Sequence, residues 1–259
     1  MKIGEVIGVI EEFAPPSVQE SWDNSGLIIG NTDNSVSKVL LALDCTLETV
    51  FEAEDIGAEL IITHHPLIFK GLKRIDGRTN IGRAIIQAIK SNIAVYSVHT
   101  NIDKVLNGVS GLMAKKLNLK NIEVLCRDKS EDEIGLGVVG DLERPLEFDE
   151  LCIMVEKQFS PEVLKISKPL EGKISRVALC GGNGSSIIEE AMQSGAQVYI
   201  SGDISYHNFF CEDGFMVIDI GHYESEIGVL ELLSDILSKK LPNFAAYISE
   251  GINPVRYIF

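Results

Sequence analysis

SKVLLALDCTLETVFEAEDIGAELII (residues 37–62) and SRVALCGGNGSSIIEEAMQSGAQVYI (residues 175–200) align without a gap at an offset of 138 residues, the difference between positions 37 and 175. Eight of the 26 aligned positions are identical, and most of the others pair one apolar residue with another. Such self-similarity at a fixed spacing indicates an internal duplication. We therefore predict two related halves, residues 1–125 and residues 126–259.

Each copy of the repeat predicts a strand, a helix and a second strand. Short apolar runs have the length of buried strands, and longer amphipathic stretches that end at a glycine are typical of helices. We expect strands at 39–43, 60–62, 93–98, 176–179, 198–200 and 216–220, and helices at 3–13, 47–56, 81–90, 186–193 and 227–239. This alternation predicts an α/β fold with largely parallel sheets. Residues 126–175 are predicted to be less regular, with CRDKSEDE (126–133) as a loop or linker.

The charge of the chain restricts the partners that it can have. There are 38 acidic and 23 basic residues, which gives a net charge of −15. A nucleic-acid-binding surface needs cations opposite the phosphates, and anionic membranes also attract cations, so both partners are disfavoured. One local basic patch remains compatible with this composition.

The cellular compartment is predicted from segments that the sequence lacks. No stretch approaches the ~18 apolar residues of a membrane span, and Glu5, Glu11 and Glu12 interrupt the first apolar pattern, so we expect no signal peptide. The five cysteines are widely spaced and contain no C-x-x-C pair, which is typical of reduced thiols and offers no zinc ribbon. We expect a cytoplasmic protein.

All five histidines lie at or just beyond predicted strand ends, where ligands bind in α/β sheets. Asp103 follows His99 by four residues, and Glu226 follows His222 by four. If Ser225 or a nearby residue opens the last helix, His222 and Glu226 can point the same way from one helical face. Neutral imidazole and carboxylate suit divalent ions such as zinc, iron or manganese. The ligands that we predict for two ions, with Glu226 bridging them, are His64, His65, Asp103, His222 and Glu226. The alternative is a hydrogen-bonded cluster of core histidines.

Four motifs resemble the signatures of the Nif-three-like family, whose members are commonly labelled GTP cyclohydrolase type 2 homologs or dinuclear metal centre hexameric proteins. The motifs are THHPLIF (63–69), HTNID (99–103), SGDISYH (201–207) and GHYESE (221–226). Shorter stretches that also resemble the family are WDNSGL (22–27), LALDCT (41–46) and CGGNGSS (180–186). The matches span nearly the whole chain in the right order.

The resemblance implies a two-metal centre between two intertwined α/β halves and a ring-shaped homohexamer with an internal cavity. The family's ligands fall on the same five residues, and none of these positions departs from the family pattern. Some relatives carry an extra domain between the halves, for which residues 126–175 leave no room.

The function that we expect is metal-dependent hydrolysis of a small molecule, with a nucleotide as one candidate. Two divalent ions per subunit would activate a shared water. His99 and His207 are outside the ligand set and are candidates for orienting ligands or for acid–base catalysis. Purine ring opening, phosphoester cleavage and amide cleavage all fit this chemistry. The competing interpretation is a non-enzymatic metal-binding or scaffold hexamer, and a third is the processing of single-stranded nucleic acid, which the charge disfavours.

Three weaker signals leave two interpretations each. The glycine-rich residues 181–186 could bind an anion through backbone N–H groups, or form a turn with Ser185 or Ser186 as the helix N-cap. Residues 22–24 could line a pocket or anchor a loop. A local basic cluster could be a solvated loop or could contact a phosphorylated substrate; it consists of Lys70, Lys73, Arg74 and Arg78.

Overall fold

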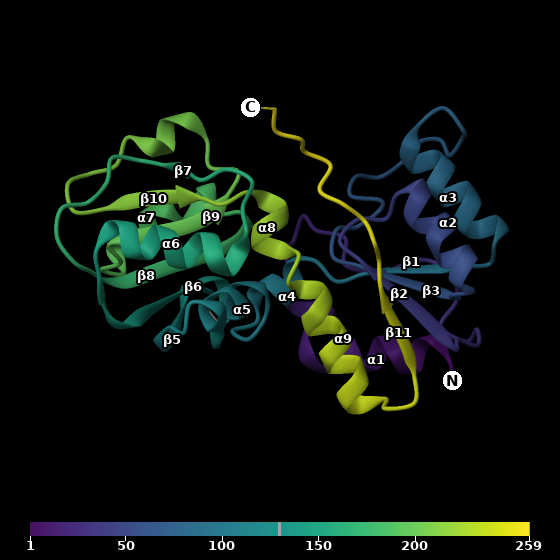
Figure 1. The fold of residues 1–259 in the computed structure, drawn as a ribbon. Coiled ribbons are helices and arrows are strands. Elements are labelled where there is room, and N and C mark those ends of the chain that lie inside the picture. Colours follow the sequence, from purple (N-terminus) through teal and green to yellow (C-terminus); the bar gives the residue numbers. More distant parts are fainter. Residues whose placement is uncertain (129–130, 259) are drawn as a thin grey trace. The chain divides into compact units, whose positions relative to one another are not determined.

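The computed structural model describes residues 1–128 and 131–258 and divides the chain into two compact units. The first contains residues 1–102 and 229–252, and the second contains residues 103–228 and the chain from Asn253 onward. Each unit has one β-sheet flanked by helices (Figure 1), so the α/β prediction is confirmed. Because these units are defined by spatial packing, the division of the sequence at residue 125 stays a prediction.

The sheet of the first unit has the strand order β1-β4-β3-β2-β11. Its strands are β1 (Gly26–Ile29), β2 (Lys38–Ala42), β3 (Leu60–Thr63), β4 (Ala94–Ser97) and β11 (Ala245–Ile248). Neighbouring strands pair in parallel, except that β1 runs antiparallel to β4. One face is covered by α2 (Leu47–Ile56) and α3 (Asn80–Lys90), and the other by α1 (Ile3–Phe13) and α9 (Val229–Lys240) (Figure 1).

Burial on both faces explains why β2, β3 and β4 are almost wholly apolar. Leu40, Ile61 and Val95 belong to the hydrophobic cluster beneath α2 and α3, while Leu41 and Ile62 are buried on the opposite face. Because these three strands are parallel, the loops that follow them emerge at one edge of the sheet, where polar side chains can gather.

The sheet of the second unit has the order β5-β6-β8-β9-β10-β7. Its strands are β5 (Lys120–Asp128), β6 (Glu131–Leu146), β7 (Lys165–Ile166), β8 (Ile174–Asn183), β9 (Val198–Gly202) and β10 (Met216–Asp219). The three central strands β8, β9 and β10 are parallel, whereas β5, β6 and β7 join antiparallel.

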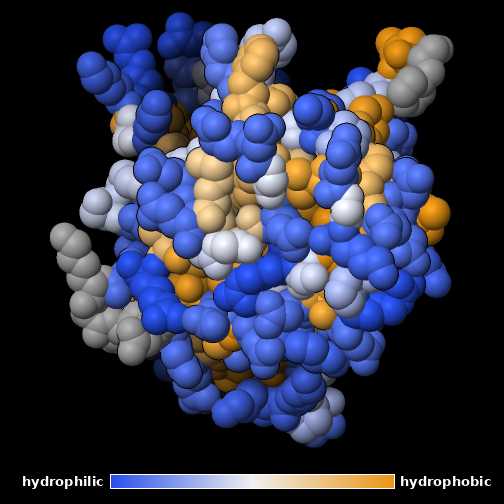
Figure 2. All heavy atoms as spheres, turned by 90° about the vertical axis from the view of Figure 1, so that its left-hand side faces the viewer, coloured by the Kyte–Doolittle hydropathy of each residue, from blue (hydrophilic) through white to orange (hydrophobic). Residues whose placement is uncertain are grey.

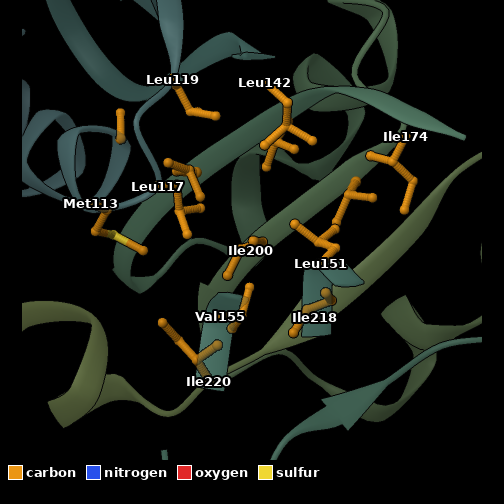
Figure 3. Close-up of a cluster of buried hydrophobic side chains, with 14 of the residues drawn as sticks. Met113, Leu117, Leu119, Leu142, Leu151, Val155, Ile174, Ile200, Ile218 and Ile220 are labelled. Carbon is orange, nitrogen blue, oxygen red and sulfur yellow. The ribbon is translucent and has the colours of Figure 1, made fainter. Parts of the chain in front are cut away.

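The core of the second unit lies between its sheet and two helices, α5 (Val109–Lys116) and α6 (Phe148–Phe159). Figure 3 shows Leu151 and Val155 of α6 beside Ile200 and Ile218 of the sheet. A shorter helix, α7 (Ile188–Gln193), covers the other face. The remaining short helices are η1 (Pro16–Val18), α4 (Thr100–Lys104), η2 (Ser185–Ile187), η3 (Tyr206–Phe209) and α8 (His222–Glu226).

The strand register of the two sheets repeats at the offset of the sequence alignment. Val39 lies opposite Leu60 in the β2–β3 pair, and Val177 lies opposite Val198 in the β8–β9 pair. Each residue of the second pair lies 138 positions after its counterpart in the first pair. The β–α–β units therefore superimpose in register as well as in sequence, which supports an internal duplication.

Side-chain contacts of the repeat are also duplicated. The backbone N–H of Ser37 donates to the carboxylate of Glu59 (3.1 Å), and that of Ser175 donates to the amide oxygen of Gln197 (2.7 Å). The α-helix of each copy, α2 or α7, is followed by a glycine in the left-handed conformation, Gly57 with φ 68° and Gly195 with φ 79°. The same local interactions thus begin and end the equivalent elements.

The prediction for residues 126–175 was wrong, because this stretch is largely regular. The charge-rich residues 126–133 were expected to form a loop, but 126–128 end β5 and 131–133 begin β6, while residues 129–130 lie outside the described residues. β5 is an edge strand with one exposed face, so charged residues such as Glu123 and Arg127 are tolerated on it. In the described part of this segment, charge therefore did not indicate a loop.

The surface seen in Figure 2 is mainly hydrophilic, with hydrophobic side chains in scattered patches. Across the described residues, no helix combines the length and the apolar character that a membrane crossing requires. All five cysteines are free thiols.

We predict that Ile218→Ala destabilises the protein much more than Ile153→Ala. Ile218 is completely buried, whereas Ile153 on the outer face of α6 is 64% exposed. Loss of a buried isoleucine side chain costs about 2–5 kcal/mol, and an exposed substitution changes the free energy of unfolding by about 0.5 kcal/mol or less. Urea denaturation of both variants measures the difference, and equal losses would contradict the packing described here.

Candidate metal centre

The first unit presents two adjacent histidines at the carboxyl end of β3. The backbone N–H groups of His64 and His65 donate to the carbonyls of Ala42 (3.1 Å) and Leu43 (2.9 Å), which extends the pairing with β2 past the strand end. His64 is fully buried and His65 is half-buried. The backbone around both rings is therefore fixed by the sheet.

Hydrogen bonds at Nδ1 determine which ring nitrogen of these histidines can bind a metal. His64 Nδ1 lies 2.9 Å from the carbonyl oxygen of Val98, and because a carbonyl only accepts, Nδ1 carries the proton. His65 Nδ1 lies 2.9 Å from a carboxylate oxygen of Asp44, which likewise accepts. In the neutral imidazole the lone pair is then on Nε2, the arrangement of metal-binding histidines that are oriented by a carbonyl or a carboxylate.

The second unit presents His222 and Glu226 on the short helix α8 (Figure 1). They are four residues apart on one helical face, and His222 Nε2 lies 3.0 Å from a carboxylate oxygen of Glu226. His222 Nδ1 lies 2.9 Å from a carboxylate oxygen of Asp203. The i, i+4 pairing predicted from the sequence is confirmed, and Nε2 of this third histidine is again oriented by a carboxylate at Nδ1.

Two glycines leave the space that α8 needs. A Cβ on Gly182 would collide with Oε1 of Glu226, and a Cβ on Gly202 would lie 2.7 Å from the Cα of His222. Gly182 also has a φ of 64°, which L-residues rarely adopt. The ends of β8 and β9 are therefore shaped to admit the side chains of this helix.

Asp103 lies on α4 in the second unit and is half-buried. The pKa of the Cys180 thiol is raised to about 12, mainly by burial and in addition by the negative charges of Asp103 and Glu226. The two predicted carboxylate ligands of this unit thus both exert their charge on the same residue near the end of β8. Cys180 itself stays protonated and buried, so it offers no thiolate ligand near neutral pH.

His99, a predicted proton-transfer residue, lies against the histidines of the first unit. Its ring centroid is 5.4 Å from that of His64 and 5.6 Å from that of His65. His99 Nδ1 lies 2.7 Å from a carboxylate oxygen of Asp23. Burial alone would raise the pKa of the Asp23 carboxyl, but hydrogen bonds from His99 and Thr100 outweigh it and hold that pKa well below its usual range. Asp23 is therefore ionised and orients the His99 ring.

His207, the other predicted proton-transfer residue, lies on η3 in the second unit and is exposed. Its ring contacts that of Tyr206 at a centroid distance of 5.4 Å. No carboxylate holds His207 as Asp23 holds His99 among the residues described. Its orientation is consequently less constrained.

Neither interpretation of the glycine-rich residues 181–186 describes what they do. The N–H of Gly182 donates to Ser225 Oγ (2.9 Å), that of Gly184 to Ser201 Oγ (3.0 Å), and that of Ser185 to the side chain of Asn183 (3.1 Å). These donors are satisfied within the protein and are not free to bind an anion. η2 begins after Gly184 without a side-chain cap, so a serine N-cap was also wrong. The loop instead holds Ser225 of α8 in place.

Three carboxylates that orient histidines were missed by the sequence analysis, namely Asp23, Asp44 and Asp203. Each occurs within a stretch that had been singled out, WDNSGL, LALDCT or SGDISYH. For Asp44 and Asp203 the available signal was an acidic residue just beyond a strand end, which is where the partner of a metal-binding histidine would lie, whereas Asp23 precedes β1 and had no such signal.

Comparisons with known proteins bear on the resemblance that the sequence motifs indicated. The sequence profile of the Duf34/NIF3 (NGG1p interacting factor 3) family matches residues 1–254. A protein of Clostridium perfringens named GTP cyclohydrolase 1 type 2 homolog is 34% identical over 262 aligned positions that cover 100% of both chains. A relative of the same name from Clostridium acetobutylicum is 37% identical and covers 98% of this chain and 93% of its own.

Solved structures show the same fold. The crystal structure of a hypothetical protein from Staphylococcus aureus matches with a TM-score of 0.91 and 30% sequence identity, covering 100% of this chain and 99% of that one. The resemblance inferred from the sequence motifs is therefore confirmed.

We predict that Gly182→Ala disturbs α8 and lowers metal affinity, whereas Gly195→Ala does not affect metal binding. Both glycines have positive φ, so each substitution costs about 1–2 kcal/mol of backbone strain. Only the Cβ at position 182 also meets a side chain, that of Glu226, and overpacking adds about 1–3 kcal/mol. Urea denaturation and metal titration of both variants measure the two effects. Equal behaviour of the two variants would show that Gly182 makes no room for Glu226.

Proposed function

Because the chain belongs to the Duf34/NIF3 family, we propose that it binds two divalent metal ions and uses them to hydrolyse a small molecule. The observation that carries this proposal is the common orientation of His64, His65 and His222. In each, an acceptor lies at Nδ1, so that Nε2 is the nitrogen available to a metal ion; Nε2 of His222 also lies 3.0 Å from the carboxylate of Glu226, with which it would share the ion.

We propose five ligands for the two ions, with Glu226 as the bridging carboxylate. The ligands are His64, His65, Asp103, His222 and Glu226. By the donor atoms that they offer, His64, His65 and Glu226 suit a metal ion. Imidazole nitrogen and carboxylate oxygen without thiolate favour zinc, iron or manganese.

When bound, two such ions lower the pKa of water and stabilise negative charge on a reacting oxygen. The contribution of the chain is to hold the ligands rigid, through Val98, Asp44 and Asp203. His99, oriented by Asp23, can accept or donate a proton at Nε2 beside the substrate. His207 is the second candidate for this task.

The substrate class is proposed from the relatives. The name of these relatives, GTP cyclohydrolase 1 type 2 homolog, refers to a reaction on a nucleotide. We propose that the substrate of this protein is a nucleotide or a similar small molecule. The strongly negative chain makes a nucleic acid a poor partner. The cytoplasmic location stays a prediction.

The metal ligands can be tested by replacing two neighbouring glutamates of α8. Glu226→Gln should lower the content of both ions, because a bridging group serves both, whereas Glu224→Gln on the same helix should keep them. Glu224 is buried but accepts a hydrogen bond from Asn253 (3.0 Å), an interaction that glutamine retains. Elemental analysis of metal-loaded protein gives the stoichiometry.

The same variants test hydrolysis when turnover of GTP and of a generic phosphodiester is measured. Truncation of a ligand, as in His65→Ala, should remove turnover together with metal, and chelation should do the same to the unmodified protein. Full turnover after chelation would refute the two-metal mechanism. Tight binding of both ions without turnover of any substrate would favour the metal-binding scaffold.

We also propose a homohexamer, with the family resemblance as its support. Light scattering on the purified protein should give six times the mass of one chain. A monodisperse monomer at working concentration would contradict this assembly.

A further inference from the structure

Two exposed aromatic side chains lie beside His99 in the first unit. Trp22 and Phe69 are 58% and 44% exposed, and their ring centroids are 5.8 Å apart. The His99 ring is steeply inclined to both, at interplanar angles of 74° and 82° and centroid distances of 6.4 Å from Trp22 and 6.1 Å from Phe69. We call Trp22 and Phe69 the aromatic platform. Large apolar side chains that gather in water beside a polar site are typical of binding surfaces.

Hydrogen bonds on both sides fix the loop that carries Trp22. Asn24 Nδ2 donates to the carbonyl of Ile68 (2.6 Å), which ties this loop to the segment before Phe69. Asp23 accepts from His99 and from the N–H of Thr100 (3.0 Å). The platform is therefore pre-organised, which lowers the entropic cost of binding a ligand.

An exposed group of cations follows the platform directly in the sequence. Lys70, Lys73 and Arg74 are exposed, and within the part of the chain that the structure describes none forms an ion pair. Arg78, by contrast, binds Asp76 through a hydrogen bond from Nε (3.0 Å). Chain length alone keeps the Cα atom of Lys73 within about 14 Å of that of Phe69.

We propose that the aromatic platform stacks the base of a nucleoside phosphate and that Lys70, Lys73 and Arg74 bind its phosphate. This substrate class deepens the proposed hydrolytic function and rests on it. Aromatic faces stack planar bases of any sequence, and lysine and arginine recognise phosphate through charge-assisted hydrogen bonds. Three uncompensated cations in a chain of net charge −15 are complementary to such an anion.

Other occupants of this surface are outcomes of the test. Leu72 and Ile75 on the same loop are also exposed, at 42% and 52%, so a second copy of the chain could cover it. A short single strand of DNA would also combine bases with phosphates. We favour a mononucleotide because the cations are confined to one loop of an acidic protein.

The experiment uses the fluorescence of Trp22, the only tryptophan of the chain. The full-length protein is chelated, so that no ligand can bind through metal, and is titrated with GMP, guanosine, inorganic phosphate and a short single-stranded DNA. GMP should quench the fluorescence saturably, guanosine should bind more weakly, and phosphate alone should leave the signal unchanged. Added salt should weaken the binding of GMP but not that of guanosine.

Matched variants separate stacking from phosphate binding. Phe69→Ala should weaken GMP binding about 10-fold, whereas Phe51→Ala, which removes an aromatic side chain of the same 44% exposure from α2, should not. Replacing both Lys73 and Arg74 by Ala should reduce GMP to the affinity of guanosine, and Lys90→Ala, at an exposed site on α3, should have no effect.

Three results would overturn the proposal. They are the absence of saturable quenching by GMP, protection of Trp22 from acrylamide in the assembled protein, and binding of the DNA strand without binding of GMP. Because the titration is made without metal, such a failure would leave the metal centre standing. A failure of the metal-content test would in turn leave GMP binding intact.

Discussion

The hydrogen bond at Nδ1 of each of the three histidines proposed as ligands is the constraint on which the candidate site depends. A neutral imidazole can carry its lone pair on either nitrogen, and an acceptor at one nitrogen favours the proton there and the lone pair on the other. In His64 that acceptor is a backbone carbonyl, and in His65 and His222 it is a carboxylate. Because the acceptors sit on strand ends and the loops beyond them, the sheets set the direction of all three rings.

Duplication gave the two units a similar β–α–β backbone but different side chains at equivalent positions. His64 and His65 at the end of β3 correspond, at the offset of 138 residues, to Gly202 and Asp203 at the end of β9. In the first unit the strand end itself supplies histidines. In the second it supplies space and an orienting carboxylate, while the histidine comes from the following helix α8. A further pair shows the same exchange, since Asp44 orients His65 whereas its counterpart Gly182 admits Glu226.

The parts of this fold that the sequence predicts are those with a strong local signal. The repeat, the buried parallel strands and the histidines at strand ends follow from apolar runs and spacing, and the structure has them. The predicted strand at 93–98 is observed as Ala94–Ser97, and the predicted helix at 227–239 as Val229–Lys240. β1, β11 and the long strand β6 were missed, because edge and antiparallel strands are stabilised by partners distant in sequence and tolerate polar residues. Asp23 was missed as a partner of His99 for the same reason, since the two are 76 residues apart.

The orienting carboxylates also determine the distribution of charge around the candidate site. Carboxylates that orient histidines add negative charge where a substrate of the proposed reaction would approach, and a phosphorylated substrate would be repelled by them. Cations close to the ligands would also repel a divalent ion, so the two requirements conflict if they are met at one place. Here the exposed cations Lys70, Lys73 and Arg74 lie beyond Phe69, outside the strand-end residues that carry His64 and His65. Along the sequence after β3, the histidines that suit a metal ion thus come first and the cations that suit an anion come later. The exposed ring of Phe69 lies between these two segments.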